Sequence, residues 1–224
     1  MVGRAFRRAG RILIAFRDAV AQIQAKMLRA WLEYRLRDRD IRRVNLCCGQ
    51  QKVSGFYGVD RMEDTDLRLD LSRVDLPFVD SSLDVIVCMS AINYFTRKRA
   101  QQLVVEMYRA LKPKGVCRVG VQDLRSLTER YVKGDNSFFF QKLADGRDRF
   151  EGPTIGDKYV AWFYGYAIGA SRCEYFYDFD SLAYLFHEAG FTKIEQKRYR
   201  ESAIAEVALL DNREDQMFFL EAVK

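Results

Sequence analysis

The stretch Arg42–Asp60, RRVNLCCGQQKVSGFYGVD, decides the fold. It begins as a strand that runs into a turn at Gly49, and it ends as a second strand closed by Asp60. An acid at the end of the second strand is typical of the βαβ unit that opens a nucleotide-binding fold. Only seven residues separate Cys48 from Phe56, whereas a parallel crossover usually takes about a dozen or more. The helix of this unit is therefore missing, and one face of the sheet needs another cover.

Strand-like and helix-like segments alternate after this point. Residues 97–113 repeat apolar positions at helical spacing, and residues 181–191 form a second such pattern that ends at Gly190. Strands alternating with helices predict an α/β fold with a mainly parallel sheet. The expected strands are seven in number: 42–47, 56–60, 67–70, 84–89, 115–122, 193–199 and 216–224.

Residues 1–40 predict one long amphipathic helix that precedes the domain of residues 41–224. Its apolar stripe has the members Phe16, Val20, Ile23, Met27, Trp31 and Tyr34. The opposite face carries Arg4, Arg7, Arg8 and Arg11. We expect the stripe to pack on the sheet face that the missing helix leaves bare. Two other readings stay open, namely contact of the arginines with an anionic membrane or protein partner and an Arg-rich transit peptide.

Composition limits the class of protein. A chain of 224 residues with 49% hydrophobic and 30% charged residues suits one well-cored globular domain. Residues 1–43 hold twelve Lys and Arg against four Asp and Glu, a net charge of +8, so the remaining residues carry −2 of the total +6. A nearly neutral body argues against nucleic-acid binding across its surface. No apolar run approaches the roughly 20 residues that cross a bilayer.

The cysteines and the histidine indicate no metal site. Five cysteines show no C-x-x-C spacing, and His187 is the only histidine. An odd number of cysteines, mostly inside apolar runs, predicts reduced thiols in a cytoplasmic compartment, with peripheral attachment to a membrane as a further option. His187 falls on a predicted surface helix, where a structural or solvent-facing role is expected.

The order of the segments resembles the class I S-adenosylmethionine-dependent methyltransferases, in their compact bacterial branch. The segments that carry this resemblance are VNLCCG, GFYGVD, LPFVDSSLDVI, YRALKPKG and YDFDSLAYLFHEAGF. The likeness runs from about Val44 to the C-terminus. The resemblance implies a Rossmann-like sheet of seven strands and S-adenosylmethionine as cofactor. The loop itself lacks the G-x-x-x-x-G-K-[ST] and G-x-G-x-x-G patterns, so it is unsuited to a phosphate ligand.

The resemblance also implies a cofactor site at the ends of the first four strands. Asn45 and the backbone of Cys47 to Gly49 would lie beside the methionine tail, and Asp60 would accept hydrogen bonds from the ribose hydroxyls. Asp70 and Leu71 would flank the adenine. The segment Cys88–Met89–Ser90 would face the reacting methyl group. The residues expected to bind the cofactor are Asn45, Cys47, Gly49, Asp60, Asp70, Leu71, Met89 and Ser90.

The chain departs from the family pattern at positions that bear on catalysis. Cys47 and Lys114 stand where glycine is usual. After the fourth strand the family often reads H-x-L-E-H-F, whereas Ser90, Asn93 and Tyr94 replace the two histidines and the glutamate here. Transfer to oxygen or nitrogen generally needs a group that takes the acceptor's proton. No catalytic residue is assigned from the sequence.

An aromatic-rich insertion, residues 131–179, follows the fifth strand. It interleaves rings with charged residues such as Arg172 and Glu174. We expect either a lid over a methyl acceptor or a separate hydrophobic cluster under a long loop. The predicted function is methyl transfer to a small molecule, a glycan or a lipid-linked acceptor. Two alternatives remain: a catalytically impaired binding or assembly protein, and a nucleic-acid methyltransferase that uses the Arg-rich arm.

Overall fold

The computed structural model describes the backbone of residues 2–164 and 172–224 and the side chains of residues 17–164 and 172–224. A seven-stranded sheet has the order β3-β2-β1-β4-β5-β7-β6. The strands are β1 (Arg43–Leu46), β2 (Tyr57–Asp60), β3 (Leu67–Arg68), β4 (Leu83–Met89), β5 (Leu111–Gln122), β6 (Lys193–Lys197) and β7 (Met217–Val223). Strands β1 to β5 pair in parallel, and β7 runs antiparallel to both β5 and β6. The predicted Rossmann-like, mostly parallel sheet is confirmed.

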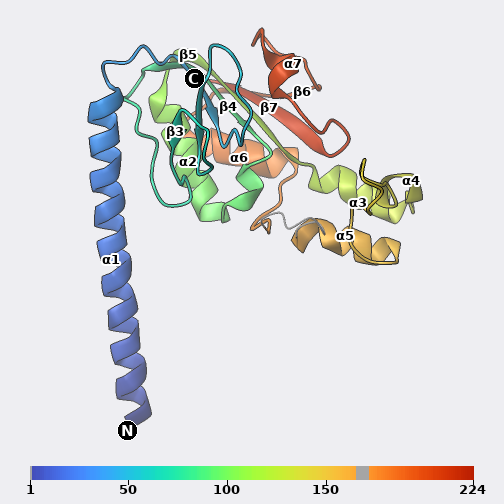
Figure 1. Cartoon of the computed structure of the whole chain (residues 1–224), viewed down its shortest axis with the longest axis horizontal. Helices are drawn as coiled ribbons and strands as arrows, with labels where there is room; N and C mark the ends of the chain where they lie inside the picture. Colours follow the sequence, from blue (N-terminus) through green and yellow to red (C-terminus); the bar gives the residue numbers. More distant parts are fainter. Residues whose placement is uncertain (1, 165–171) are drawn as a thin grey trace.

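Two of the helices, α2 and α6 with the bounds given next, cover one face of this sheet (Figure 1). The helices are α1 (Val2–Leu36), α2 (Arg97–Ala110), α3 (Leu124–Val132), α4 (Asn136–Phe139), α5 (Ile155–Tyr164), α6 (Phe179–Ala189) and α7 (Val207–Leu210), with a short 3-10 turn η1 (Ile92–Tyr94). Thr96 caps α2, and a capping box of Asp178 and Ser181 begins α6. Apolar side chains of α2 and α6 form the main core with every second residue of β4 and β5.

The opposite face of the sheet is covered by the chain between β6 and β7. Val87 and Met89 of β4 and Phe219 of β7 pack there with Ile204 and Leu210. Val53, from the short connection between β1 and β2, joins the same cluster. The segment from Arg198 to Gln216, with α7 in it, thus occupies the face that the missing crossover helix left bare.

A buried arginine holds this covering segment in place. Arg118 of β5 is fully buried, and its five N–H groups all have acceptors. Nε and Nη2 donate to the two carboxylate oxygens of Asp211 at 2.8 and 2.6 Å. Nη1 donates to Glu201 O at 2.9 Å and Glu221 Oε2 at 3.3 Å, and Nη2 donates to Arg198 O at 3.2 Å. The guanidinium therefore joins β5 to both ends of the segment.

The expected position of the N-terminal helix is wrong. Ile23, Met27, Trp31 and Tyr34 of the predicted stripe are 54–68% exposed. The face that packs is a different one: Leu32 and Leu36, near the end of α1, enter the core on the α2 side of the sheet. Figure 1 shows the rest of α1 extending beyond the domain. The side chains of Phe16, Arg4, Arg7, Arg8 and Arg11 lie outside the described residues.

The aromatic insertion forms a small lobe with its own core. Phe138, Phe139, Phe150 and Trp162 are buried together between α3, α4 and α5. This lobe stands beyond the end of β5 in Figure 1. The hydrophobic-cluster alternative therefore describes these rings, while residues 165–171 of the insertion lie outside the described part of the chain. The boundaries of the proposed domains stay a prediction.

Substituting Arg118 should destabilise the whole domain. Arg118→Met keeps apolar bulk but leaves the carboxylates of Asp211 and Glu221 buried without their cation, which costs about 3–5 kcal/mol of unfolding free energy. Chemical denaturation measures the loss. The matched control is Arg125→Met, because Arg125 is 64% exposed and its ion pairs are long, so its loss should stay below about 0.5 kcal/mol. Equal stability of the two variants would contradict the role given to Arg118.

Candidate functional site

The loop after β1 is shaped by the carboxylate that ends β2. Asp60 is 9% exposed, its Oδ2 accepts the backbone N–H of Gly49 at 2.8 Å, and its Oδ1 accepts that of Met62 at 2.9 Å. Each carboxylate oxygen offers about two lone pairs, so Asp60 keeps acceptor capacity for a ligand while it fixes two loops. This explains why an acid is placed at the strand end.

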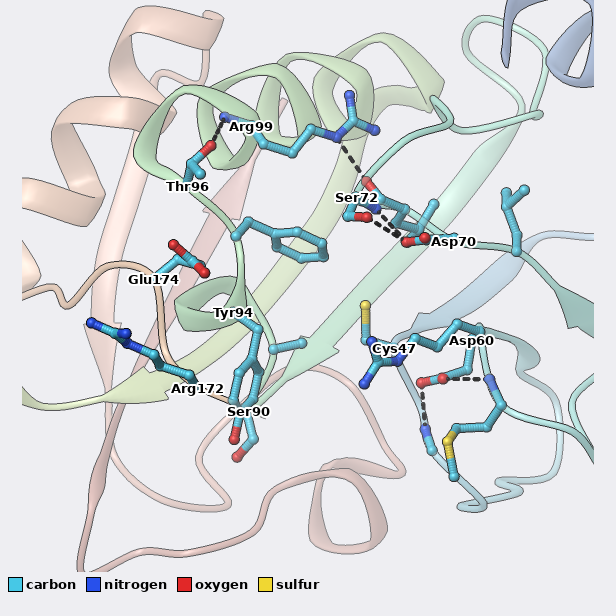
Figure 2. Close-up of a pocket in the computed structure, with 17 residues that line it drawn as sticks. Cys47, Asp60, Asp70, Ser72, Ser90, Tyr94, Thr96, Arg99, Arg172 and Glu174 are labelled. Carbon is cyan, nitrogen blue, oxygen red and sulfur yellow. Dashed lines mark hydrogen bonds between the residues drawn. The ribbon is translucent and has the colours of Figure 1, made fainter. Parts of the chain in front are cut away.

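A cavity of about 850 Å³ opens beside Asp60. Six of the eight residues expected to bind a cofactor line it: Cys47, Gly49, Asp60, Asp70, Leu71 and Ser90. Figure 2 shows Asp60 and Asp70 on one side of this cavity and Ser90 on the other. The strand ends of β1, β2 and β4 bring them together, because the carboxyl ends of parallel strands meet at one edge of the sheet.

Two predicted residues do not line the cavity. Asn45 is buried within β1 and borders a separate, very small hollow with Cys48 and Gly58. Met89 packs in the cluster under α7. Successive side chains of a strand point to opposite faces, so Cys88 and Met89 diverge even though they are neighbours in the sequence.

Two non-glycine residues adopt the backbone conformation that explains the usual glycines. Cys47 has φ +53° and Lys114 has φ +69°. A left-handed conformation costs an ordinary residue about 1–2 kcal/mol, which glycine avoids. The Cys47 side chain also packs against the main core. The neighbouring thiol of Cys88 and burial raise the pKa of Cys47, so it stays a neutral thiol at physiological pH.

An arginine missed by sequence reasoning supports the Asp70 side of the cavity. Arg99, on the first turn of α2, donates to Leu71 O at 2.7 Å, Val74 O at 2.8 Å and Asp75 Oδ1 at 2.6 Å. Asp70 Oδ1 accepts the N–H and the Oγ–H of Ser72 at 2.9 and 2.6 Å. The loop that carries Leu71 is therefore held from both sides. In the sequence, Arg99 belongs to a charged run that resembles a solvated helix face.

The other end of the cavity is polar. It is lined by Ser90, Tyr94, Thr96, Arg172 and Glu174, which Figure 2 shows across the cavity from Asp60. Burial raises the pKa of the Tyr94 phenol, so this hydroxyl stays protonated well above neutral pH. Ser90 Oγ donates to Asn212 Oδ1 at 3.1 Å. Among the described residues, the Glu174 carboxylate has no hydrogen-bond or ion-pair partner.

Asn93, at the position where the family often has glutamate, fastens the segment that carries these polar groups. It is fully buried, and its Nδ2 donates to Tyr175 O at 3.1 Å. Its Oδ1 accepts the N–H of Gln122 at 3.2 Å, and its backbone oxygen accepts the N–H of Glu174 at 2.8 Å. Asn93 therefore joins the ends of β4 and β5 to the segment that carries Glu174. Its role is structural, and the side chain does not face the cavity.

The remaining candidates lie elsewhere. His187 is exposed on α6, and its Nδ1 lies 3.8 Å from Glu188 Oε1. Within the part of the chain that the structure describes, no group of three or more His, Cys, Asp and Glu could hold a metal ion. All five cysteines are free thiols. Burial raises the pKa of Cys173, in the segment held by Asn93, to about 11.

Comparison with known proteins bears on this arrangement. Residues 40–119, which contain β1 to β4, α2 and part of β5, match the family described as a methyltransferase domain. By this match, residues 40–119 carry a methyltransferase domain. S-adenosylmethionine is the cofactor of such domains. No match to a curated protein was found.

Solved structures resemble this chain at low sequence identity. A protein of Pyrococcus horikoshii OT3 has a TM-score of 0.50 and 15% identity over 88% of this chain and 89% of that chain. An S-adenosylmethionine-dependent methyltransferase of Mesorhizobium loti has a TM-score of 0.48 and 17% identity over 83% and 91%. Phosphoethanolamine N-methyltransferase 2 of Haemonchus contortus, in complex with S-adenosyl-L-methionine, has a TM-score of 0.47 and 14% identity over 82% and 48%.

The volume of the cavity and the polar and apolar groups that line it fit S-adenosylmethionine. Its volume lies within the range of about 300–1,000 Å³ that small-molecule sites occupy. Asp60 can accept hydrogen bonds from hydroxyl groups, while Leu69, Leu71 and Phe95 supply an apolar wall for a planar base. Cys47, which stands where glycine is usual, lines the cavity but does not close it.

Removing the Asn93 side chain should loosen the Glu174 segment. Asn93→Ala deletes two buried hydrogen bonds, each worth about 1–3 kcal/mol when its partner stays buried. Local opening should expose Cys173, so its labelling by a thiol reagent at neutral pH should speed up at least about tenfold. Mass spectrometry of peptides separates Cys173 from the other thiols. Cys117, deep in the sheet, is the internal control, and equal acceleration at both would indicate global unfolding instead.

Proposed function

We propose that this chain transfers a methyl group from S-adenosylmethionine to a small molecule, a glycan or a lipid-linked head group. The observation that carries the proposal is the single cavity that joins Asp60 and Asp70 at one end to Ser90, Tyr94, Arg172 and Glu174 at the other. The cofactor, when bound, supplies a methyl group on a sulfonium centre. Its transfer is an in-line displacement that depends mainly on positioning.

The chain's own residues divide into two groups in this proposal. Asp60 would hold the ribose hydroxyls, Leu71 would pack on the adenine, and the backbone from Cys47 to Gly49 would hold the methionine tail. Arg172 and Glu174 would bind a polar acceptor at the other end. A cation and a carboxylate there suit an acceptor with hydroxyl, amine or acid groups.

Glu174 is the group we propose to accept the acceptor's proton. An O–H or N–H acceptor loses its proton as the new bond to the methyl carbon forms. The Tyr94 phenol lies at the same end, but its raised pKa keeps it protonated and unsuited to that task. In this proposal Glu174 accepts the proton, the role for which the histidine and glutamate that this chain replaces are the usual candidates. The segment that Asn93 holds carries Glu174.

The cofactor end is tested by calorimetry. We expect the protein to bind S-adenosylmethionine and its demethylated product at one site with micromolar affinity. Asp60→Ala removes a charged acceptor whose hydrogen bonds are worth about 1.5–3 kcal/mol each, so the affinity should fall at least about tenfold. The control is Glu63→Ala, in the same loop but exposed, which should leave the affinity unchanged. Circular dichroism checks that both variants fold.

Absence of binding at millimolar cofactor would overturn the proposal. It would favour the impaired binding or assembly protein, for which the replaced loop glycine at Cys47 is the supporting observation. Methylation of RNA with a steep salt dependence would instead favour the nucleic-acid enzyme. Unchanged affinity in a folded Asp60→Ala protein would remove Asp60 from the site.

The proton-accepting role of Glu174 has its own test. For any sugar, amine or acid that the wild-type protein methylates in a screen, Glu174→Gln should lower the turnover rate by about 10²–10⁴. Cofactor affinity should stay within about threefold, because Glu174 lies at the far end of the cavity from Asp60. Glu129→Gln, an exposed glutamate on α3, is the matched control. A Glu174→Gln protein with full turnover would show that the proton leaves by another route.

A further inference from the structure

The exposed face of α1 lies opposite the face that docks on the domain. Ala25, Leu32 and Leu36 pack against the core, and Arg29 Nε donates to Leu76 O at 3.2 Å. At about 100° per residue, these positions are centred on the side of the helix opposite Met27. The apolar residues on the Met27 side are the members of one exposed set: Val20, Ile23, Met27, Leu28, Trp31 and Tyr34.

This outer face is wide and lies at the edge of the molecule. Its members span more than a third of the helix circumference at about 100° per residue, which is broader than the a and d seam of a coiled coil. Leu28 and Trp31 fall outside a heptad seam that runs through Val20, Ile23, Met27 and Tyr34. In Figure 1 α1 runs along one edge of the molecule, so a flat surface can reach the outer face without meeting the domain.

Cations stand beside the exposed rings at the domain end of α1. The Arg35 guanidinium lies 5.2 Å from the Trp31 ring centre, and the Arg37 guanidinium lies 4.4 Å from that of Tyr34. A groove of about 350 Å³ next to Trp31 is lined by three arginines, Arg35, Arg39 and Arg68, and by a single acid. Aromatic rings with arginines beside them are typical of proteins at the level of lipid head groups.

We propose that α1 docks this protein on the surface of an anionic phospholipid bilayer. The helix lies in the plane of the interface with the outer face in the acyl region, and Arg35 and Arg39 meet lipid phosphates. A broad apolar face with cations beside it is a feature of such interfacial helices, and here the opposite face is taken up by the domain. The net charge of +8 in residues 1–43 is complementary to an anionic surface, whereas the rest of the chain carries −2.

Docking differs from spanning. Within residues 2–164 and 172–224, no helix combines the length and apolar content that crossing a bilayer requires. At 1.5 Å per residue, the described outer face from Val20 to Tyr34 gives about 21 Å of contact along the surface. The inference is independent of the methyl acceptor, because it rests on α1 and not on the cavity.

Flotation of the full chain with vesicles tests the docking. We expect binding to phosphatidylcholine vesicles that contain about 30% phosphatidylglycerol, and much weaker binding to phosphatidylcholine alone. Met27→Gln/Trp31→Gln should lower the partition coefficient at least about tenfold, because both side chains would be buried in the bilayer. The control Gln22→Ala alters an exposed position away from the outer face and should change nothing.

The electrostatic part is tested separately. Arg35→Gln/Arg39→Gln should lower binding to the anionic vesicles by about thirtyfold. The matched control is Arg125→Gln/Arg147→Gln, which removes the same charge from arginines that are 64% and 63% exposed elsewhere. It should leave binding within about threefold. Equal losses in the two double variants would reduce the effect to net charge and overturn the assignment to this surface.

Tryptophan fluorescence places the contact. Trp31 is 54% exposed and Trp162 is 2% exposed, and they are the only tryptophans. Vesicles should therefore shift the emission of the wild-type protein to shorter wavelength through Trp31, and Trp31→Phe should abolish the shift while it retains binding. Failure of the wild-type protein to bind anionic vesicles overturns the proposal. A dimer in sedimentation that Met27→Gln/Trp31→Gln dissociates would then assign the outer face to a second copy of the chain.

Discussion

The rest of this structure depends on the hydrogen bonds that the buried guanidinium of Arg118 makes. A sheet of parallel strands needs cover on both faces, and the short connection between β1 and β2 provides no helix for one of them. The chain between β6 and β7 takes that place, but it has little regular structure beyond α7. Four hydrogen bonds from the Arg118 side chain fix this segment, two of them to the carboxylate oxygens of Asp211, and a fifth reaches Glu221 of β7.

That arrangement leaves the carboxyl edge of the sheet free to form a site. Two polar side chains with backbone partners define its two ends. Asp60 draws together the loops at Gly49 and Met62, and Asn93 draws the Glu174 segment to the ends of β4 and β5. Because both are buried and bonded to backbone groups, the cavity between them is preorganised, and a ligand need not order its walls.

The N-terminal helix shows that amphipathicity by itself does not say which surface an apolar face meets. The stripe of Ile23, Met27 and Trp31 has the spacing of a face that packs on a sheet. The sheet, however, is covered on one side by α2 and α6 and on the other by the segment from Arg198 to Gln216. Two smaller contacts, Leu32 and Leu36, position the helix instead. The larger apolar face was left outside.

By itself the sequence determined the α/β class, the seven strands and the strand-end location of the site, because these depend on local periodicity and on the rule that parallel strands share a carboxyl edge. Six expected residues line the cavity for that reason. Met89 does not, since alternation along β4 turns it to the other face. Only the tertiary structure decided the hydrogen bonds between residues that are distant in the sequence. Arg118 is 93 residues from Asp211, and Asn93 is 82 residues from Tyr175. No local pattern in the sequence records which distant partner a buried polar group will find.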